Sequence, residues 1–394
     1  MTHYDYLLIG GGMTGAAAIE GIRAVDKSGT IGLIGAEADR PYNRPPLSKG
    51  LWKGDTTLDD IWTGAAESDA TLHLGRTARA IDPQAKQVTD DTGTVYSYDK
   101  LLLATGGTPR RLPFGGNDII YYRTLGDYRR LRALAETGQR FAVIGGGFIG
   151  SEIAAALSMF GKQVVLLFPE PAIGARIYPA DLAQFLNDYY REHGVDVQAG
   201  ASVTGVTPKG NGYRVHTKEG QTFDVDGVVA GIGMQPNVDL AQAAGLRVDN
   251  GILVDEYLRT SAPAIYAAGD AARYPDALFG SRRVEHENNA VQMGKRAGRA
   301  MAGDEKPYRH QPFFYSDLFD LGYEAVGEMD SRMETWADWK EPFREGVVYY
   351  LRDGRVRGVL LWNVWEQVGA ARKLLAETGP FTAHDLQGRL PVQQ

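Results

Sequence analysis

A glycine-rich motif that occurs twice constrains the fold of this chain more than any other feature. Each copy reads Gly-x-Gly-x-x-Gly between an apolar run and a small-residue helix, once at 10–15 and again at 145–150. The first glycine permits a tight turn, the second lets the backbone approach a pyrophosphate, and the third lets the helix pack against the strand. One such motif also fits a glycine-rich turn in an unrelated α/β unit. Two in one chain predict two dinucleotide sites, with phosphates at the helix N-termini.

A carboxylate follows each motif at the end of a second predicted strand. Glu37 comes after the strand at 30–34, and Glu170 comes after the strand at 163–168. A carboxylate at this place accepts hydrogen bonds from a ribose 2'-hydroxyl and repels a 2'-phosphate. The pattern therefore favours NADH over NADPH at the second site, and Arg176 nearby softens that preference.

The composition excludes several classes of chemistry. The 394 residues contain no cysteine, so neither a disulfide pair nor cysteine-ligated iron–sulfur clusters can carry electrons. Any redox chemistry then belongs to a bound cofactor. No pair among the seven histidines has metal-ligand spacing, so no metal site is predicted. The net charge of −7 argues against general nucleic-acid binding.

The chain length predicts two or three domains. No apolar run reaches about 18 residues, and the first strand follows the N-terminus without a secretory pattern, so a cytoplasmic protein without a membrane span is expected. Two basic clusters, Arg129-Arg130-x-Arg132 and Arg282-Arg283, fit either solvated helix faces or docking of an acidic protein.

The run Pro41-Tyr-Asn-Arg44-Pro-Pro-Leu-Ser-Lys49 links the first motif to a known group. Its prolines hold an extended loop that presents two cations to an anionic ligand. It resembles a motif of FAD-dependent reductases, the ferredoxin reductase and apoptosis-inducing factor family. The resemblance implies that Arg44 meets the FAD pyrophosphate and that Lys49 reaches the flavin.

Further motifs follow in the order of that family. The resemblance places Ala78 at the adenine, Ala104-Thr105-Gly106 at the second FAD signature, Gly233 near the nicotinamide and Asp270 at the ribityl chain. It also places Glu285 and His286 at the flavin and nicotinamide rings. Glu324 and Asn363 would approach NAD, as would Glu170 and Arg176.

The motif Phe-x-Tyr315-Ser-Asp departs from the family, which has Trp in place of Tyr315, and this leaves the packing against the flavin open. Core packing is the alternative for the surrounding aromatic residues and is expected for Phe313 and Trp362.

The expected fold class is α/β, with two Rossmann-like three-layer dinucleotide-binding domains, similar to those of glutathione reductase, and a small α+β C-terminal domain. The predicted boundaries are 1–112 and 245–310 for a discontinuous FAD domain, 113–244 for the NAD domain and 311–394 for the C-terminal domain. Within the first domain, 71–81 is expected to be one strand. The tail after about Asp385 has no pattern and is expected to be mobile.

The predicted catalytic residues are Lys49, Glu152, His286 and Tyr315. By resemblance, Glu152 pairs with Lys49 and orients it, and a surface salt bridge of little consequence is the alternative. The full set of predicted cofactor ligands is Gly10, Gly12, Met13, Thr14, Gly15, Glu37, Arg44, Lys49, Ala78, Ala104, Thr105, Gly106, Arg123, Gly145, Gly147, Phe148, Ile149, Gly150, Glu152, Glu170, Arg176, Gly233, Asp270, Glu285, His286, Tyr315, Glu324 and Asn363.

The expected function is that of an FAD-dependent NADH oxidoreductase, in which a hydride passes from NADH to FAD N5. Three destinations for the electrons stay open. They are an acidic ferredoxin-like or rubredoxin-like carrier protein, a quinone or dioxygen, or no acceptor at all. In the last case the chain would be an NADH sensor that resembles apoptosis-inducing factor, holds a stable complex of reduced flavin and NAD, and forms a homodimer under redox control.

Overall fold

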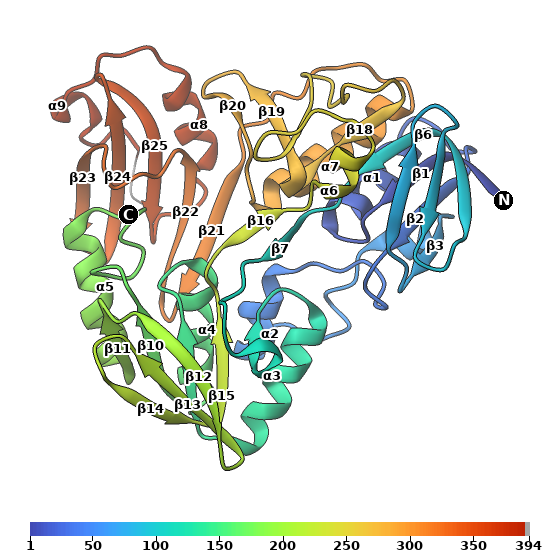
Figure 1. The fold of residues 1–394 in the computed structure, drawn as a ribbon. Coiled ribbons are helices and arrows are strands. Elements are labelled where there is room, and N and C mark those ends of the chain that lie inside the picture. The colour runs from blue at the N-terminus through green and yellow to red at the C-terminus, as the bar shows by residue number, and fades with distance from the viewer. Residues whose placement is uncertain (391–394) are drawn as a thin grey trace. The chain divides into compact units, whose positions relative to one another are not determined.

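The computed structural model describes residues 1–390, with only the backbone of Ala66 and Glu67. The chain divides into two compact units (Figure 1). Unit 1 contains residues 1–44, 58–108 and 235–312, and unit 2 contains 45–57, 109–234 and 313 onward. Each unit is described separately below.

Unit 1 is built on a mixed sheet with the order β3-β2-β1-β6-β5-β4, to which β18 adds beside β6. Strands β1, β2, β3, β6 and β18 run parallel, with β18 beside residues 101–103 of β6. Strands β4, β5 and β6 form an antiparallel meander, in which β5 pairs with residues 95–97 of β6. The elements are β1 (Thr2–Ile9), α1 (Met13–Arg23), β2 (Ile31–Gly35), a 3-10 turn (Gly64–Glu67), β3 (Thr71–Leu74), β4 (Ala78–Asp82), β5 (Gln87–Asp90), β6 (Val95–Leu103), α6 (Asp239–Ala243), β17 (Ile252–Leu253), β18 (Ile265–Ala267), a 3-10 turn (Gly269–Ala271), β19 (Ala272–Asp276), β20 (Gly280–Arg282) and α7 (Glu287–Met301). Two short strands, β7 (Gly107–Pro109) and β16 (Met234–Pro236), lie where the chain passes between the units.

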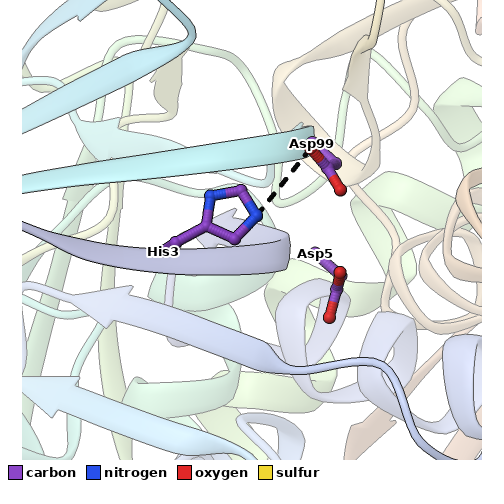
Figure 2. Close-up of side chains that lie close together, drawn as sticks. All are labelled: His3, Asp5 and Asp99. Atoms are coloured by element: carbon purple, nitrogen blue, oxygen red, sulfur yellow. Dashed lines mark ion pairs between the residues drawn. The ribbon is translucent and has the colours of Figure 1, made fainter.

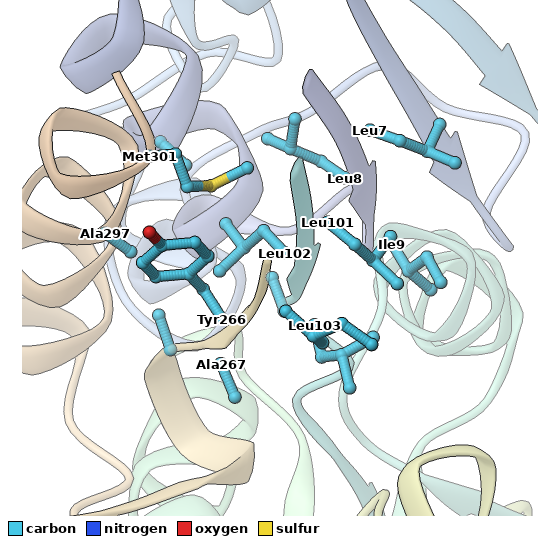
Figure 3. Packing of buried hydrophobic residues seen from close by; sticks show 14 of the residues in the cluster. Leu7, Leu8, Ile9, Leu101, Leu102, Leu103, Tyr266, Ala267, Ala297 and Met301 are labelled. Carbon is cyan, nitrogen blue, oxygen red and sulfur yellow. The ribbon is translucent and has the colours of Figure 1, made fainter. Parts of the chain in front are cut away.

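The core of unit 1 lies around the central parallel strands (Figure 3). Apolar side chains at 7–9 and 101–103 are buried in consecutive runs, as expected for strands covered on both faces. Residues of β18 and α7, among them Tyr266 and Met301, complete the same cluster. The first glycine motif therefore follows a strand that is held firmly in the core.

Truncating this core should cost much stability. We expect Leu102→Ala to lower the free energy of unfolding by about 2–5 kcal/mol, because a fully buried side chain leaves a cavity between packed layers. Urea denaturation measures the change. Leu58→Ala removes a leucine that is 39% exposed and should change stability by less than about 0.5 kcal/mol.

Unit 2 contains a parallel sheet with the order β11-β10-β9-β15-β8, an antiparallel sheet β12-β13-β14, and a C-terminal antiparallel sheet β21-β22-β25-β24-β23. The elements are a 3-10 turn (Pro45–Ser48), α2 (Gly50–Lys53), a 3-10 turn (Gly116–Asp118), β8 (Ile119–Tyr121), α3 (Leu125–Thr137), β9 (Arg140–Ile144), α4 (Phe148–Met159), β10 (Gln163–Phe168), α5 (Ala180–Glu192), β11 (Val195–Ala199), β12 (Val203–Lys209), β13 (Gly212–Thr217), β14 (Thr222–Val225), β15 (Gly227–Ala230), β21 (Phe313–Leu318), β22 (Leu321–Gly327), β23 (Glu334–Glu341), β24 (Glu345–Arg352), β25 (Arg355–Trp362), α8 (Val368–Ala376) and α9 (Ala383–Leu386).

Two local expectations were wrong. The single strand predicted over 71–81 is two strands, because the backbone turns at Gly75 with φ of +65°. β3 pairs with β2, whereas β4 pairs with β5. The tail after Asp385 is packed as far as it is described, since Leu386 and Leu390 are buried, and its last part, 391–394, lies outside the described residues.

Within residues 1–390, no helix combines the length and the apolar character needed to cross a membrane.

Candidate functional site

The two glycine motifs adopt the same backbone geometry, one in each unit. Gly10 and Gly145 have φ of +124° and +113°, and the helices that follow begin after Gly12 and Gly147 without a side-chain cap. The amide groups of a first helical turn have no intrahelical partner and carry partial positive charge. Each helix start is therefore suited to bind the phosphates of a dinucleotide.

Close packing makes the third glycine of each motif necessary. A Cβ on Gly15 would lie 2.1 Å from the Gly10 carbonyl oxygen, and a Cβ on Gly150 would lie 1.8 Å from the Gly145 oxygen. A Cβ on Gly10 would itself lie 2.0 Å from the Ala104 oxygen, so the second FAD signature supports the first turn. The sequence prediction of two equivalent turns agrees with this geometry.

In unit 1, three side chains meet beside the first glycine turn. Arg44 Nη2 lies 2.5 Å from Glu37 Oε1, and Tyr42 donates from its hydroxyl to Glu37 Oε2. Arg44 Nη1 also donates to the Tyr42 hydroxyl at 3.0 Å. A Cβ on Gly12 would lie 3.8 Å from Arg44 Nη2, which places the guanidinium near the turn. Tyr42 was not predicted, although it stands inside the same motif.

Other predicted unit 1 ligands flank this turn. The Met13 sulfur accepts a hydrogen bond from Arg44 N, and a Cβ on Gly269 would lie 2.2 Å from Thr14 Oγ1. Asp270 follows that glycine and is only 8% exposed. The segment before Asp270 and the start of α1 are thus in contact, as the separate signatures require.

Three further predicted ligands lie on other chain segments. Thr105 Oγ1 donates to the Asn237 carbonyl oxygen at 2.7 Å, and Asn237 Nδ2 donates back to the Thr105 carbonyl at 2.9 Å. Ala78 begins β4. Arg123 belongs to unit 2, where its backbone N–H donates to Asp127 Oδ2 before α3. The Thr105–Asn237 pairing was not predicted, because the two residues are 132 positions apart and no local pattern connects them.

Glu285 and His286 stand at the start of α7 in unit 1. Glu285 Oε1 pairs with Arg283 Nη1, and His286 occupies the N-cap position. Arg282 binds Asp276, whose side chain is 1% exposed. Acidic side chains bind both guanidinium groups of the predicted basic cluster Arg282-Arg283, and the two arginine side chains are only 16% and 11% exposed, so the cluster is not a solvated helix face. Docking of an acidic protein stays a prediction.

Burial, together with the positive charge of Arg282, lowers the pKa of His286 to about 4. The imidazole is therefore neutral in the folded protein at physiological pH. Because the folded protein resists protonation that the unfolded chain accepts near pH 6.5, stability falls as the pH drops from 6.5 to 4.

We expect His286→Gln to lose less stability than the wild type over that pH range. Urea denaturation at pH 7 and pH 5 measures both proteins. His3→Gln removes an exposed histidine and serves as the control. Equal losses for wild type and His286→Gln would contradict the assignment.

In unit 2, Glu152 is the centre of a buried polar cluster. Lys49 Nζ lies 2.7 Å from Glu152 Oε1, with the two side chains 11% and 4% exposed. Ser48 and Ser316 also donate to the carboxylate. The Tyr315 ring lies 5.2 Å from Lys49 Nζ, a cation–π distance. The alternative of a surface salt bridge is wrong, because both groups are buried.

The loop that carries Lys49 is anchored by its own backbone. The Leu47 carbonyl oxygen accepts hydrogen bonds from Trp52 Nε1 at 2.9 Å and from the Tyr122 hydroxyl. Trp52 in turn packs edge-on against Tyr128 and Phe160. These contacts hold the Lys49 loop on the helices of unit 2.

Around the second glycine motif, Glu170 Oε1 accepts from Arg176 Nη2 at 2.6 Å, with Glu170 28% exposed and Arg176 84% exposed. Gly233 follows β15 with φ of +96° and accepts a hydrogen bond from Arg110 N. Phe148 and Ile149 begin α4, and Ile149 is 37% exposed. The predicted ligands of the second site therefore lie on three neighbouring chain segments.

We expect Glu170→Ala to lower the ratio of kcat/KM for NADH to that for NADPH by about tenfold, because the repulsion of a 2'-phosphate is lost. Steady-state kinetics with both nucleotides measures the ratio. Arg176→Ala should move the ratio in the opposite direction. An unchanged ratio in Glu170→Ala would contradict this role of the carboxylate.

The predicted residues of the C-terminal domain have different environments. Asn363 Oδ1 accepts from Gly322 N at 2.7 Å and its Nδ2 donates to the Arg344 oxygen at 3.0 Å, so the side chain stabilises a turn with φ of +50°. Burial raises the pKa of Glu324, whose Oε2 has no hydrogen-bond partner among the described residues. Trp362 is fully buried, as expected, whereas Phe313 is only half-buried.

One cluster outside these sites has metal-ligand types. Ligand atoms of His3, Asp5 and Asp99 lie within 4.8 Å of one another (Figure 2). His3 Nε2 is 3.8 Å from Asp99 Oδ1, and both side chains are more than half exposed. Asp5 already accepts two hydrogen bonds from Thr30, which lower its pKa. The contact of His3 with Asp99 and the hydrogen bonds of Asp5 with Thr30 explain this surface cluster.

Comparison with known proteins gives matches over most of the chain. The model of the pyridine nucleotide-disulphide oxidoreductases matches residues 4–294. The model of the C-terminal region of mitochondrion-associated apoptosis-inducing factor matches 297–341 and 337–377.

Similar proteins include members of two functional groups. The chain is 35% identical over 370 residues to the 5,5'-dehydrodivanillate O-demethylase ferredoxin reductase subunit of a Sphingobium species, covering 90% of this chain and 89% of that protein. It is 34% identical over 416 residues to apoptosis-inducing factor 1 of Dictyostelium discoideum, covering 94% and 78%. The crystal structure of a covalent putidaredoxin reductase–putidaredoxin complex matches with a TM-score of 0.87 and 31% identity, covering 95% and 92%. These matches confirm the predicted α/β fold class with its C-terminal sheet domain.

Proposed function

Because the chain belongs to the pyridine nucleotide-disulphide oxidoreductase family, we propose that it is a flavoprotein that oxidises NADH with FAD as its redox group. The observation that carries this proposal is the pair of glycine turns with equal geometry, one in each unit. The family name includes a disulfide, but the 394 residues contain no cysteine. The cofactor must therefore accept the electrons that a cysteine pair would otherwise accept.

The residues of unit 1 fit FAD. The uncapped start of α1 suits the pyrophosphate, Arg44 supplies a cation beside it, Glu37 suits a ribose, and the buried carboxylate of Asp270 suits the ribityl hydroxyl groups. When bound, FAD supplies a ring that accepts a hydride and releases electrons singly or in pairs. We propose that the FAD domain contains residues 1–112 and 245–310 and that these residues bind FAD in these roles.

The residues of unit 2 fit NADH. The start of α4 suits its pyrophosphate, and Glu170 suits the free 2'-hydroxyl of its adenosine ribose. Lys49 presents a positive charge to the flavin ring, and Glu152 orients that charge. The protein then contributes to hydride transfer by holding the nicotinamide and flavin rings at the right distance and by placing charge beside the flavin.

The proposed acceptor is a one-electron carrier protein, because ferredoxin reductases are among the relatives that align over nearly the whole chain. A second candidate is a slow NADH sensor with redox-controlled dimerisation. It is favoured by the match of 297–377 to the C-terminal region of apoptosis-inducing factor. A quinone or dioxygen is the alternative acceptor for the reductase. The cytoplasmic location stays a prediction.

Anaerobic titration of the purified protein with NADH tests the proposal. The protein should be yellow, and NADH should bleach it. Rapid reoxidation by an added ferredoxin or quinone would support the reductase. A broad absorbance band at long wavelength that persists in air would support the sensor, and dimer formation on NADH addition should accompany it. Absence of a flavin spectrum would refute both.

A further inference from the structure

The Glu152 carboxylate is more fully bonded than a simple ion pair with Lys49 requires. Its Oε2 accepts from Ser48 Oγ at 2.6 Å, and its Oε1 accepts from Ser316 Oγ at 2.6 Å as well as from Lys49 Nζ at 2.7 Å. Both serines are buried, with exposed fractions of 7% and 1%. They come from segments 104 and 164 residues away from Glu152 in the sequence.

A buried carboxylate whose only partner is an ammonium group holds that ammonium in place. Moving the ammonium away would leave an unpaired charge in a medium of low polarity, which is strongly unfavourable. Hydrogen bonds from hydroxyl groups to a carboxylate are short and stronger than neutral ones. Two such bonds, one on each oxygen, hold the Glu152 carboxylate in addition to its ion pair with Lys49.

Lys49 has a second contact outside this carboxylate. Its ammonium lies 5.2 Å from the centre of the Tyr315 ring, at a distance where the ring face attracts a cation. Hydrogen bonds to the Leu47 carbonyl hold the loop backbone. The Lys49 ammonium thus has two attractive neighbours, the Glu152 carboxylate and the Tyr315 ring, while separate hydrogen bonds hold the loop backbone.

We propose that Ser48 and Ser316 are positioning residues that hold the Glu152 carboxylate in place independently of Lys49, so that the Lys49 ammonium can exchange between Glu152 and the flavin. The contact of Lys49 with the flavin rests on the proposed function. The support of Glu152 by the two serines does not depend on it.

The first test is a double-mutant cycle, in which the melting temperature of each purified variant is measured. Lys49→Ala should lower the melting temperature in the wild type and lower it at least twice as much in the Ser48→Ala/Ser316→Ala background. The reason is that Glu152 then has neither cation nor hydroxyl donors. Equal decreases in the two backgrounds would overturn the proposal. If the double variant does not fold, Ser48→Ala alone gives the same cycle with a smaller difference.

The second test is kinetic and needs the bound flavin. The double serine variant should reduce its flavin with NADH about tenfold more slowly, with NADH affinity unchanged within twofold and a more negative flavin potential. In the Lys49→Ala background the same serine substitutions should change the rate by less than twofold. Additive losses in the two backgrounds would mean that the serines act only through general stability, and would overturn the proposal.

Two control variants are available in the same region. Ser151→Ala removes the hydroxyl of the residue next to Glu152. Within the described part of the chain this hydroxyl donates to the Gly147 and Phe148 carbonyl oxygens, so the substitution should leave both cycles unchanged. Ser48→Thr keeps a hydroxyl group and should restore most of the loss seen in Ser48→Ala. A protein without flavin would fail the proposed function, while the melting cycle would still decide the serine proposal.

Discussion

Gly15→Ala and Gly150→Ala are expected to remove different cofactors from the protein. Gly15→Ala should yield protein without bound flavin. Gly150→Ala should keep the flavin but lose at least a hundredfold in NADH affinity. In both cases the added Cβ would meet the carbonyl oxygen of the first glycine of the motif, at 2.1 and 1.8 Å respectively. The turn must then open, and the helix start moves away from the phosphates that it binds.

Absorbance at 450 nm measures retained flavin, and titration with NADH under anaerobic conditions measures nucleotide affinity. Gly369→Ala is the matched control, because its Cβ would meet no atom within 4 Å and it lies within the first turn of α8. It should keep both cofactors. Loss of flavin in Gly150→Ala with retention in Gly15→Ala would reverse the assignment of the two sites.

Lys49→Ala is expected to slow flavin reduction by NADH about a hundredfold while the flavin stays bound. A positive charge in a water-poor site stabilises developing negative charge far more than one in bulk water, and loss of one such group costs about 10²–10³ in rate. The Lys49 side chain is only 11% exposed, which places it in such an environment. Stopped-flow absorbance at saturating NADH measures the rate.

Lys53→Ala is the control for this measurement. It removes the same charge one helical turn later, where Lys53 Nζ pairs with Asp317 at 3.3 Å and both side chains are more exposed. Exposed pairs contribute little, so the rate should change by less than about twofold. A Lys49→Ala protein that is reduced as fast as the wild type would exclude Lys49 from the reaction.

The family and the two dinucleotide motifs were predictable because their determinants are contiguous. Tight turns, uncapped helix starts and close helix–strand contacts require glycine at fixed spacing, and this spacing is visible in any sequence. The family resemblance is confirmed by matches over nearly the whole chain. Lys49 and Glu152, paired by resemblance, lie 2.7 Å apart in the structure.

Local conformation was less predictable where a single backbone angle decides. Residues 71–81 were read as one strand, although the glycine at position 75 is a residue that often marks a break in a strand. The positive φ at Gly75 divides the segment and sends its two parts to opposite edges of the sheet. Arg282 and Arg283 likewise read as a basic patch, although Asp276 and Glu285 bind them.

The sequence alone therefore determined the fold class, the family and the turns that would receive two dinucleotides. Only the tertiary structure decided which side chains surround each charge. Ser48 and Ser316 meet at Glu152, and Tyr42 lies between Glu37 and Arg44. The physical reason is that a motif records the local backbone geometry that its own residues impose. The partners of a buried carboxylate are instead set by how distant segments pack, and no local spacing records that packing.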